Sequence, residues 1–550
     1  MTRRIVVISG KVATGKSTLA EGLRDKFGAI VFSTRALLEQ AARRDAKSGT
    51  FNRKFLQEFG AERDRVSGGA WLADELRLLL VDSPRDQVVV IDAVRLADQL
   101  TMLRNSFGRT VVHIHLSAFD DDLADRFKLR RDSIDENLSY ELAGNDPTER
   151  QVDSLSSLAD LHINTSTADM NDVLVRCAAK IGILTSLDSQ LVDVLVGGQY
   201  GSEGKGNLAY YLAPEYDVLL RVGGPNAGHK VPTDPVVTHR SLPSGALSNL
   251  EAKIFIGAGA VISPAVLRDE IQRSRVSPDR IFIDPQAMVI SDEDVYGETA
   301  LRGAIGSTGQ GVGAALARKI NGRAAADLRL ARDTPELKQF VRAPIVDLLE
   351  ETYSLKQRVL LEGTQGTGLS LHHGRYPYVT SRDTTAAGCL SESGIGINRV
   401  RKVVMVIRSY PIRVQGESGP MGREIRWTDV AERSGFSATE LLSAEQSSVQ
   451  KKLRRVAEFD WKFLRASAQL NTPTDIALTF ADYLDQSNAN AFRFDQLSGG
   501  TREFIEEIES VTTSPVSLIS GRFTDRSVID RRRWRGHVNF DSKKRDGSNN

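Results

Sequence analysis

The sequence has few cysteines, almost no net charge and no long apolar run. Two cysteines among 550 residues exclude a disulfide framework and are too few for a structural zinc site. With 72 basic and 71 acidic side chains the net charge is +1, so no overall field attracts nucleic acid or an anionic membrane. No apolar run reaches the roughly 18 residues of a membrane span, and the chain starts without the apolar core of a signal peptide. We therefore predict a soluble, cytoplasmic protein with neither nucleic acid nor membrane as a partner.

The length and composition indicate a globular protein of more than one domain. Hydrophobic residues make up 41% and charged residues 26%, which excludes a disordered or collagenous chain. At this length about two to four domains are expected. A polar stretch at 185–190 (TSLDSQ) follows a helical pattern and marks a boundary. We predict a first domain over 1–184, a linker over 185–190, a second domain over 191–536 and a polar tail over 537–550.

Buried-strand candidates alternate with helical patterns in both parts. This alternation predicts an α/β fold with parallel sheets and right-handed crossovers. The strands expected in the first part are 4–9, 30–33, 88–92, 110–117 and 161–164. Those expected in the second part are 191–196, 218–222, 254–257, 281–284, 359–362, 403–407 and 476–480.

The first strand runs into a phosphate-binding loop. Residues 10–17 (GKVATGKS) fit the pattern G-x-x-x-x-G-K-[ST] and lie between a strand and a helix. Gly10 and Gly15 let backbone N–H groups turn toward phosphate oxygens, and the helix N-terminus adds positive potential. Lys16 can reach the β- and γ-phosphates, and Ser17 can hold Mg²⁺. We predict a nucleoside triphosphate site in which Lys16 is catalytic.

The acceptor of this phosphate is less well defined by the sequence. Asp92 ends a buried strand, where a carboxylate that binds Mg²⁺ or the acceptor belongs. Residues 53–71 (RKFLQEFGAERDRVSGGAW), with the strand VVVIDAVR, resemble deoxynucleoside monophosphate kinases. The resemblance covers about residues 1–184 and implies an acceptor pocket and an arginine lid. The arginines expected there are Arg35, Arg126, Arg130 and Arg131; each is alternatively part of a solvated helix face.

A second glycine-rich turn follows the strand expected at 191–196. Residues 197–207 (GGQYGSEGKGN) lack the spacing of the first loop, but the glycines around Glu203 and Lys205 can form an anion cradle. Shortly after it, 222–230 (VGGPNAGHK) carries Asn226 and His229 in another glycine-rich loop. A core role for His229 is disfavoured there, and a surface imidazole is the alternative.

These two stretches resemble the opening motifs of the adenylosuccinate synthetase family. Further motifs follow in order at 242–247, 257–264, 304–313, 361–366 and 376–385, and looser ones at 447–460 and 478–482. The family joins aspartate to C6 of a 6-oxopurine nucleotide, using a nucleoside triphosphate to phosphorylate O6. Together the two resemblances imply an α/β chain in which a nucleoside monophosphate kinase-like domain precedes a synthetase-like domain.

The resemblance implies a role for each matching residue. His229 would be the general acid toward O6, suited to an imidazole that titrates near neutrality. Gln365 would contact the 6-oxo group, and Lys205 would neutralise the γ-phosphate. Arg323 falls beside the family arginine that reaches the phosphate from the partner subunit, which implies a homodimer. The purine monophosphate would be held by Asn226, Thr308, Arg323, Gln365 and Thr380, and L-aspartate by Ser447, Ser448, Lys452, Arg454 and Arg455. The nucleoside triphosphate would lie at Gly201, Glu203, Gly204, Gly206, Asp482, Ser520 and Gly521, with the Gly228 carbonyl on Mg²⁺.

Three positions depart from the family pattern. Ser202 replaces an aspartate that acts as base at N1 and binds Mg²⁺; serine is smaller and uncharged, so a 2-amino group fits beside it. Guanine therefore becomes a candidate substrate, as in the phage-type branch of the family that uses dGMP, and Ser202 stays a catalytic and metal-binding candidate. Phe480 replaces a lysine that reads guanine of GTP while Asp482 remains, which favours ATP or dATP over GTP. Gln310 replaces a usual arginine.

Three functions are compatible with these residues. The first is a ligase acting on a guanine nucleotide, fused to a monophosphate kinase. The second is the same ligase acting on IMP, with water or Glu203 replacing the lost base. The third is a nucleotide-sensing or defence module that binds without turnover, since loss of a base is also how an enzyme becomes inactive.

Overall fold

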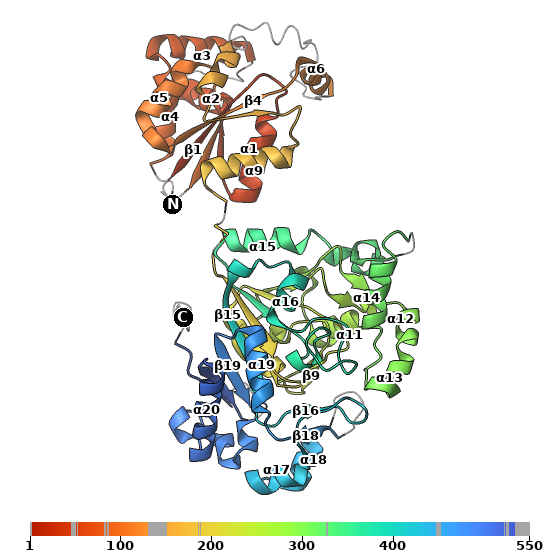
Figure 1. The fold of residues 1–550 in the computed structure, drawn as a ribbon. Coiled ribbons are helices and arrows are strands. Elements are labelled where there is room, and N and C mark those ends of the chain that lie inside the picture. The colour runs from red at the N-terminus through yellow and green to blue at the C-terminus, as the bar shows by residue number, and fades with distance from the viewer. Residues whose placement is uncertain are drawn as a thin grey trace, which may run out of the picture. The chain divides into compact units, whose positions relative to one another are not determined.

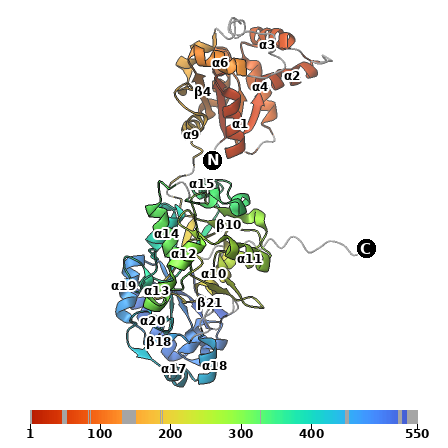
Figure 2. The ribbon, with the colours of Figure 1, turned by 90° about the vertical axis from the view of Figure 1, so that its right-hand side faces the viewer.

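The computed structural model describes residues 3–45, 51, 53–81, 84, 87–129, 151–184, 186–187, 189–325, 328–446, 453–521, 523 and 527–533. The chain forms two compact units, residues 1–184 and 185–550. In each unit a sheet lies between layers of helices (Figures 1 and 2). Among the helices of these residues, none has both the length and the apolar character that crossing a membrane requires.

The first unit is built on a five-stranded parallel sheet in the order β2-β3-β1-β4-β5. Its strands are β1 (Arg4–Ser9), β2 (Ile30–Ser33), β3 (Val88–Asp92), β4 (Val111–Ser117) and β5 (Leu161–Asn164). Its helices are α1 (Lys16–Phe27), α2 (Thr34–Arg44), α3 (Arg53–Ser67), α4 (Ala70–Leu79), α5 (Ala97–Phe107), α6 (Asp120–Leu129) and α9 (Met170–Ile181).

Alternate residues of the central strand face two different cores. Val7 packs with residues of α4 and α5, whereas Val6 and Ile8 pack with residues of α1 and α9. Since successive side chains of a strand point to opposite faces, a continuous apolar run such as RIVVIS is what a sheet covered on both faces requires.

The second unit contains a nine-stranded sheet in the order β12-β10-β7-β14-β6-β15-β19-β20-β21. Its pairs are parallel except β20 with β21. The strands of the sheet are β6 (Val192–Gly197), β7 (Val218–Arg221), β10 (Lys253–Ile256), β12 (Ile281–Ile283), β14 (Val359–Glu362), β15 (Val400–Arg408), β19 (Asp475–Thr479), β20 (Val516–Ser520) and β21 (Val528–Asp530).

Smaller sheets and helices surround it. The remaining strands are β8 (His229–Val231), β9 (Val237–His239), β11 (Val261–Ile262), β13 (Met288–Val289), β16 (Ile412–Arg413), β17 (Glu424–Ile425) and β18 (Arg455–Ala457). The helices are α10 (Lys205–Leu212), α11 (Pro264–Ser274), α12 (Asp292–Gly297), α13 (Thr299–Ile305), α14 (Val312–Asn321), α15 (Ile345–Ser354), α16 (Ala386–Ser393), α17 (Trp427–Ser434), α18 (Ala438–Ala444), α19 (Trp461–Asn471) and α20 (Gly499–Thr512).

The predicted α/β fold with parallel sheets is confirmed, and most expected strands begin or end within one residue of the observed ones. The largest difference is β15, which starts at Val400 rather than at 403. The charged Arg401 hid this extension from the apolar pattern. In the sheet its guanidinium donates from Nε to Asp193 Oδ1 on β6 at 2.9 Å, so the charge is paired within the strand layer.

Candidate active site

Many of the predicted synthetase residues lie at the carboxyl edge of the nine-stranded sheet. β14 pairs with both β6 and β7, so the loops that follow these three strands leave the sheet side by side. They carry residues 197–207, 222–230 and 363–366. Thr479–Asp482 and Ser520–Gly521 begin at the last residues of β19 and β20, which lie on the other side of β15. In parallel α/β sheets this edge is where ligands bind.

The loop after β6 is closed from inside by Glu203. The carboxylate is fully buried. Its Oε1 accepts hydrogen bonds from the backbone N–H of Gln199 (3.1 Å) and Gly201 (2.7 Å), and its Oε2 pairs with Lys205 Nζ at 2.6 Å. Lys205 itself is 2% exposed. Glu203 therefore holds the loop together and compensates the lysine, a role that the sequence pattern did not reveal.

Two glycines bring this loop against the loop after β14. A Cβ on Gly366 would lie 2.3 Å from Glu203 Oε1, and one on Gly197 would lie 2.7 Å from Lys205 Nζ. Ser202 points the other way: it is exposed, with φ +55°, and its hydroxyl makes no hydrogen bond within the described residues. The loop thus presents Ser202 outward while Glu203 and Lys205 lie beneath it.

His229 lies beside the start of α10 and is paired with a carboxylate. A Cβ on Gly206 would come 3.1 Å from His229 Cβ. His229 Nδ1 lies 2.5 Å from Glu362 Oε1 at the end of β14. Arg221 Nη1 and the Ser244 hydroxyl donate to the same oxygen at 3.2 and 2.5 Å. Because a carboxylate only accepts, Nδ1 carries the proton and Nε2 is left to a ligand.

The pocket keeps this imidazole neutral in the unliganded chain. Burial, with Arg221 adding to it, lowers the pKa of His229 to about 4. Burial alone would raise the pKa of Glu362, but His229 and Arg221 bring it down to about 2. The expectation that His229 titrates near neutrality is therefore wrong for the free protein. Glu362 and Arg221 were not among the predicted site residues, although Glu362 stands in the motif LEGTQG.

Three residues predicted to hold the purine monophosphate meet at one hydroxyl. Thr380 Oγ1 accepts from Gln365 Nε2 at 3.3 Å and from Asn226 Nδ2 at 3.4 Å. With two donors already facing it, this hydroxyl can direct its own hydrogen to an anionic oxygen. Asn226 Oδ1 is buried and has no partner within the described residues. An unpaired buried acceptor is costly, and a bound ligand would supply the missing donor.

Thr308 and Arg323 lie farther along the same unit and are exposed. Gln310 Nε2 donates to the Thr308 carbonyl at 3.3 Å, and Arg240 Nη1 donates to Gln310 Oε1 at 3.4 Å. Gln310 therefore accepts a hydrogen bond from Arg240, whereas the arginine usual at this position would itself provide a guanidinium group. Arg323 follows α14, and its exposure leaves it accessible to a second molecule. The Gly228 position is tight: a Cβ there would lie 3.0 Å from Thr238 Cγ2.

The residues predicted for the triphosphate base also come together. A Cβ on Gly521 would lie 3.7 Å from Asp482 Cβ, and Asn207 Nδ2 donates to Ser520 Oγ at 3.2 Å. Phe480, with φ +56°, is covered by Arg408, whose guanidinium carbon lies 3.9 Å from the ring centroid. Arg408 therefore places a positive charge near the position where the family has a lysine, but this charge is stacked on the Phe480 ring.

The aspartate-binding prediction is only partly covered by the structure. Ser447, Ser448 and Lys452 lie outside the described residues. Arg454 and Arg455 go to different partners: Arg454 Nη1 pairs with buried Glu445 at 3.1 Å, while Arg455 Nε donates to Glu424 at 2.9 Å. In this state the two guanidinium groups do not converge on one site.

The phosphate loop of the first unit has the expected form. Gly10 admits no side chain, because a Cβ would lie 2.2 Å from the Leu116 carbonyl oxygen, and Gly15 (φ +91°) precedes α1. Lys16 Nζ donates to the carbonyls of Gly10 and Lys11 at 2.8 and 2.7 Å. Ser17 Oγ donates to Asp92 Oδ2 at 2.9 Å, so two candidate Mg²⁺ ligands, one at the start of α1 and one at the end of β3, are in contact.

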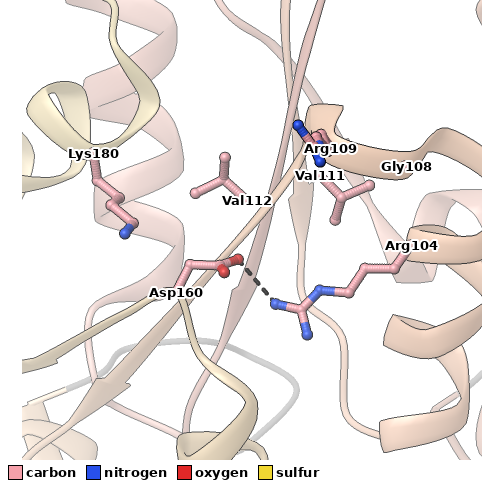
Figure 3. Close-up of a pocket in the computed structure, with 7 residues that line it drawn as sticks. All are labelled: Arg104, Gly108, Arg109, Val111, Val112, Asp160 and Lys180. Atoms are coloured by element: carbon pink, nitrogen blue, oxygen red, sulfur yellow. Dashed lines mark hydrogen bonds and ion pairs between the residues drawn. The ribbon is translucent and has the colours of Figure 1, made fainter.

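The predicted arginines of this unit are less well placed for a ligand. Arg35 pairs with Glu39 at 3.0 Å, and Arg126 donates to the Thr165 hydroxyl and carbonyl, both at 2.8 Å. Arg130 and Arg131 lie outside the described residues. A cavity of about 500 Å³ in the same unit is lined by Arg104, Arg109, Lys180, Val111, Val112, Gly108 and Asp160. Figure 3 shows Arg104 joined to Asp160 there; because β4 begins at Val111, this cavity lies at the opposite edge of the sheet from the phosphate loop.

The metal-ligand chemistry of both loops fits Mg²⁺ rather than a dedicated metal cage. Within the described residues no group of three or more His, Cys, Asp or Glu side chains can hold a metal ion. Mg²⁺ usually keeps several waters and binds through one or two protein oxygens plus substrate phosphates. Ser17 and Asp92, which are in contact, can offer such oxygens. Ser202 and the Gly228 carbonyl carry oxygens of the same kind on two separate loops of the second unit.

Comparisons with known proteins match the second unit. The family model for adenylosuccinate synthetase matches residues 194–343 and 329–491. The adenylosuccinate synthetase of Thermococcus onnurineus is 38% identical over 351 residues, which are 62% of this chain and 98% of the relative. That of Archaeoglobus fulgidus is 35% identical over 347 residues, again 62% and 98%.

Two solved structures are similar to the same share of the chain. One is the succinoaminodeoxyadenylate synthetase of cyanophage S-2L bound to dGMP and dATP as an energy donor, with a TM-score of 0.52, 28% identity, and coverage of 62% of this chain and 96% of that one. The other, fully ligated adenylosuccinate synthetase from Plasmodium falciparum, has a TM-score of 0.54 at 20% identity, covers 62% of this chain and 100% of that one, and shows a shared fold.

Proposed function

The chain belongs to the adenylosuccinate synthetase family, and on that premise we propose that its second unit condenses L-aspartate with C6 of a guanine nucleotide, dGMP or GMP. The product would be an N6-succino-2-aminoadenylate. The energy would come from ATP or dATP, whose γ-phosphoryl group passes to the 6-oxygen. The aspartate amine then attacks C6, and inorganic phosphate leaves with that oxygen.

His229 and Gln365 are the groups proposed to act on the 6-oxygen. His229 Nε2 accepts in the neutral state, because the proton sits on Nδ1 against Glu362. Anionic phosphates placed nearby favour the imidazolium and so raise the pKa of His229 on binding. The same histidine can then donate to the oxygen that develops charge. Glu362 and Arg221 hold the ring in place during both states.

The preference for guanine depends on Ser202. Its exposed side chain extends from the loop that carries Lys205, and a carboxylate there would occupy more space and add charge. The relative from cyanophage S-2L, 28% identical, is described as bound to dGMP. This likeness and the outward Ser202 together support a 2-amino group beside residue 202. Glu203 is a poor replacement base, because its buried carboxylate already receives two N–H groups and Lys205.

The preference for an adenine donor depends on Phe480 and Asp482. Phe480 offers a ring but no charge to the donor base, and the S-2L relative is described with dATP as energy donor. Mg²⁺, when bound, would neutralise phosphate charge and would be held by the Gly228 carbonyl and Ser202 in the second unit. In the proposed assembly, a homodimer, the exposed Arg323 would serve the partner's monophosphate.

For the first unit we propose phosphoryl transfer to a (deoxy)nucleoside monophosphate. The Ser17–Asp92 contact beside Lys16 supports it, since one carboxylate and one hydroxyl can share a Mg²⁺ at the phosphates. A modified monophosphate must be phosphorylated before a polymerase can use it, which gives a chemical reason for the fusion. A second enzyme that eliminates fumarate would have to act between the two steps.

Phosphate release distinguishes the proposed functions. The full chain would be incubated with aspartate, ATP and Mg²⁺, and with either dGMP or IMP. We expect aspartate-dependent release with dGMP to exceed that with IMP by at least about tenfold, the discrimination available from one well-placed group. Release with IMP alone would favour the second function.

A sensing or defence module would release no phosphate with either nucleotide. In cells His229→Ala would then leave its behaviour unchanged, whereas both enzyme functions predict a loss.

A further inference from the structure

A buried arginine stands directly behind Gln365 and has no role so far. Arg382 is 5% exposed and lies in the segment 376–385 that also carries Thr380. Its Nη1 donates to Thr364 Oγ1 at 2.8 Å, to Gln365 Oε1 at 3.2 Å and to the Thr364 carbonyl at 3.4 Å. One guanidinium nitrogen thus touches both residues that precede Gly366.

These contacts decide which way the Gln365 amide faces. Gln365 Oε1 receives Arg382 Nη1 and also the Thr364 hydroxyl, at 3.0 Å. A guanidinium group has donors and no acceptor, so the amide nitrogen cannot take this position. Nε2 therefore faces Thr380 Oγ1 and the proposed purine pocket.

The arginine is itself fixed by a second set of contacts. Its Nε donates to Glu392 Oε1 at 2.6 Å on α16, and its Nη2 lies 3.8 Å from Cys389 Sγ. On the other side, a Cβ on Gly223 would lie 2.2 Å from Thr364 Oγ1 and 3.3 Å from Arg382 Nη1. The charge is compensated and the guanidinium has little room to move.

Gln365 also needs this support for its backbone. Its φ of +60° lies in the left-handed region, which side chains other than glycine adopt only when the surroundings impose it. Hydrogen bonds to the Thr364 carbonyl and hydroxyl hold the preceding residue, and the loop after β6 packs against the following glycine.

We infer that Arg382 is the positioning residue of the synthetase site: it orients the Gln365 amide so that an N–H group, and not the carbonyl oxygen, meets the reacting 6-oxygen of the purine. This inference rests on the proposed function. Without Arg382 the amide can rotate by half a turn and place Oε1 against an oxygen that gains negative charge during phosphorylation. The loss would fall on turnover more than on ground-state binding.

The test is a double-mutant cycle in the full chain with Arg382→Met, Gln365→Met and both together. We expect Arg382→Met to lower kcat about 100-fold, the effect of a small misplacement of a reacting group, with KM for the monophosphate changed much less. In the Gln365→Met background the same substitution should have almost no further effect, because the group it positions is gone.

Two further variants cover the case in which Arg382→Met folds poorly. Thr364→Val removes the other donor to Gln365 Oε1 without removing a charge and should lower kcat in the same direction. Arg382→Lys keeps the charge for Glu392 but not the geometry, so it should not restore turnover.

Arg399→Met is the matched control. Arg399 is also a buried arginine with a glutamate partner, Glu350 at 3.3 Å, but it precedes β15 at the opposite edge of the sheet. It should lower the melting temperature and leave kcat and KM unchanged. If the effects of Arg382→Met and Gln365→Met simply multiply, or if Arg382→Met keeps wild-type kcat, the inference is overturned.

Phosphate release by the wild type tests the proposed ligase function separately from the role of Arg382. Absence of aspartate-dependent phosphate release in the wild type, with dGMP and with IMP, would contradict the ligase proposal. The same cycle would then be measured as dissociation constants for dGMP and IMP by calorimetry. A weaker coupling than in turnover is expected there, since Nε2 also meets the uncharged 6-oxygen of the bound nucleotide. Any such coupling supports the positioning role, and strictly additive effects on binding, or no binding of either nucleotide by the wild type, contradict it.

Discussion

The two phosphate loops of this chain have the same plan but different surroundings. Each follows a buried parallel strand, turns through glycines and opens a helix with a lysine. In the first loop Lys16 contacts neutral carbonyl oxygens and is only half-buried. In the second, Lys205 is buried against the carboxylate of Glu203. Because the Lys205 charge is already compensated by Glu203, it attracts a phosphate group less strongly than an unpaired lysine would. Phosphate binding at the second loop therefore requires further cations, while the buried ion pair makes the loop rigid.

The buried pairing of Lys205 with Glu203 predicts the largest effect of a substitution on stability. Glu203→Gln would leave Lys205 as an uncompensated buried charge, and we expect the second unit to lose about 3 to 5 kcal/mol of unfolding free energy. Urea denaturation followed by hydrogen exchange of peptides from each unit would measure it.

The matched variants separate charge from packing. Adding Lys205→Met to Glu203→Gln should recover most of the stability, because no charge remains buried. Lys16→Met should change the stability of the first unit by less than about 1 kcal/mol, since the Lys16 side chain is only half-buried and its surroundings stay open to water. An equal loss in both units would contradict the comparison.

Beside the second loop, the His229 imidazole on β8 contacts the carboxylate of Glu362. We expect His229→Asn to lower aspartate-dependent phosphate release at least about 100-fold, the range for a lost general acid. Any phosphoryl transfer by the first unit should be unchanged. Separate assays of the two activities in the same preparation would show whether the loss is confined to one unit, and a parallel loss of both would argue for global unfolding instead.

A smaller effect is expected at the outward face of the second loop. Ser202→Asp should shift the ratio of kcat/KM for dGMP and IMP toward IMP by about tenfold or more. Competition assays with both nucleotides present would measure this ratio. An unchanged ratio would mean that residue 202 does not meet the 2-amino group, although the ligase assignment would remain.

The smallest predicted effect is a loss of stability of the first unit at acidic pH. Beside the first loop, the Ser9 hydroxyl bonds His113 Nε2 and His115 Nδ1 at 2.7 and 2.8 Å. Burial lowers the pKa of His115 from 6.5 to about 4. The unfolded chain therefore binds more protons between these values, and the stability contributed by His115 is lost as the pH falls through that window.

We expect the first unit to lose about 1 kcal/mol from this group between about pH 7.5 and about pH 5.5. His115→Asn keeps a polar atom for Ser9 and should remove that part of the acid dependence. His162→Asn, at an exposed position, removes only the smaller repulsion from a neighbouring imidazole and should leave most of it. Hydrogen exchange of the peptides that contain β1 and β4 would measure it. An unchanged pH dependence in His115→Asn would contradict the burial argument.

Much of this fold could be predicted because its signals are local. Apolar runs predicted all strands of the first sheet and most of those of the second, and the glycine spacing predicted both loops. β20 and β21 were missed, although Val516–Ser520 is buried throughout, because a short run near the end of the chain resembles a helix segment equally well.

The candidate site was predicted less completely, and the missing residues share one property. Glu362 contacts His229 from 133 positions away and Arg221 from 141, and Arg382 reaches Gln365 from 17. Side chains that act through another residue have no spacing signal of their own. The neutral state of His229 also depended on burial, which a glycine-rich loop gives no reason to expect.

The sequence by itself determined the order of strands and helices, the positions of the two loops and the residue types at their tips, because these depend on neighbours along the chain. Only the tertiary structure decided which carboxylate faces which cation, which amide atom points outward and which imidazole stays neutral. These properties arise from burial and from hydrogen bonds between strands far apart in the chain, and they exist only once the sheet has formed.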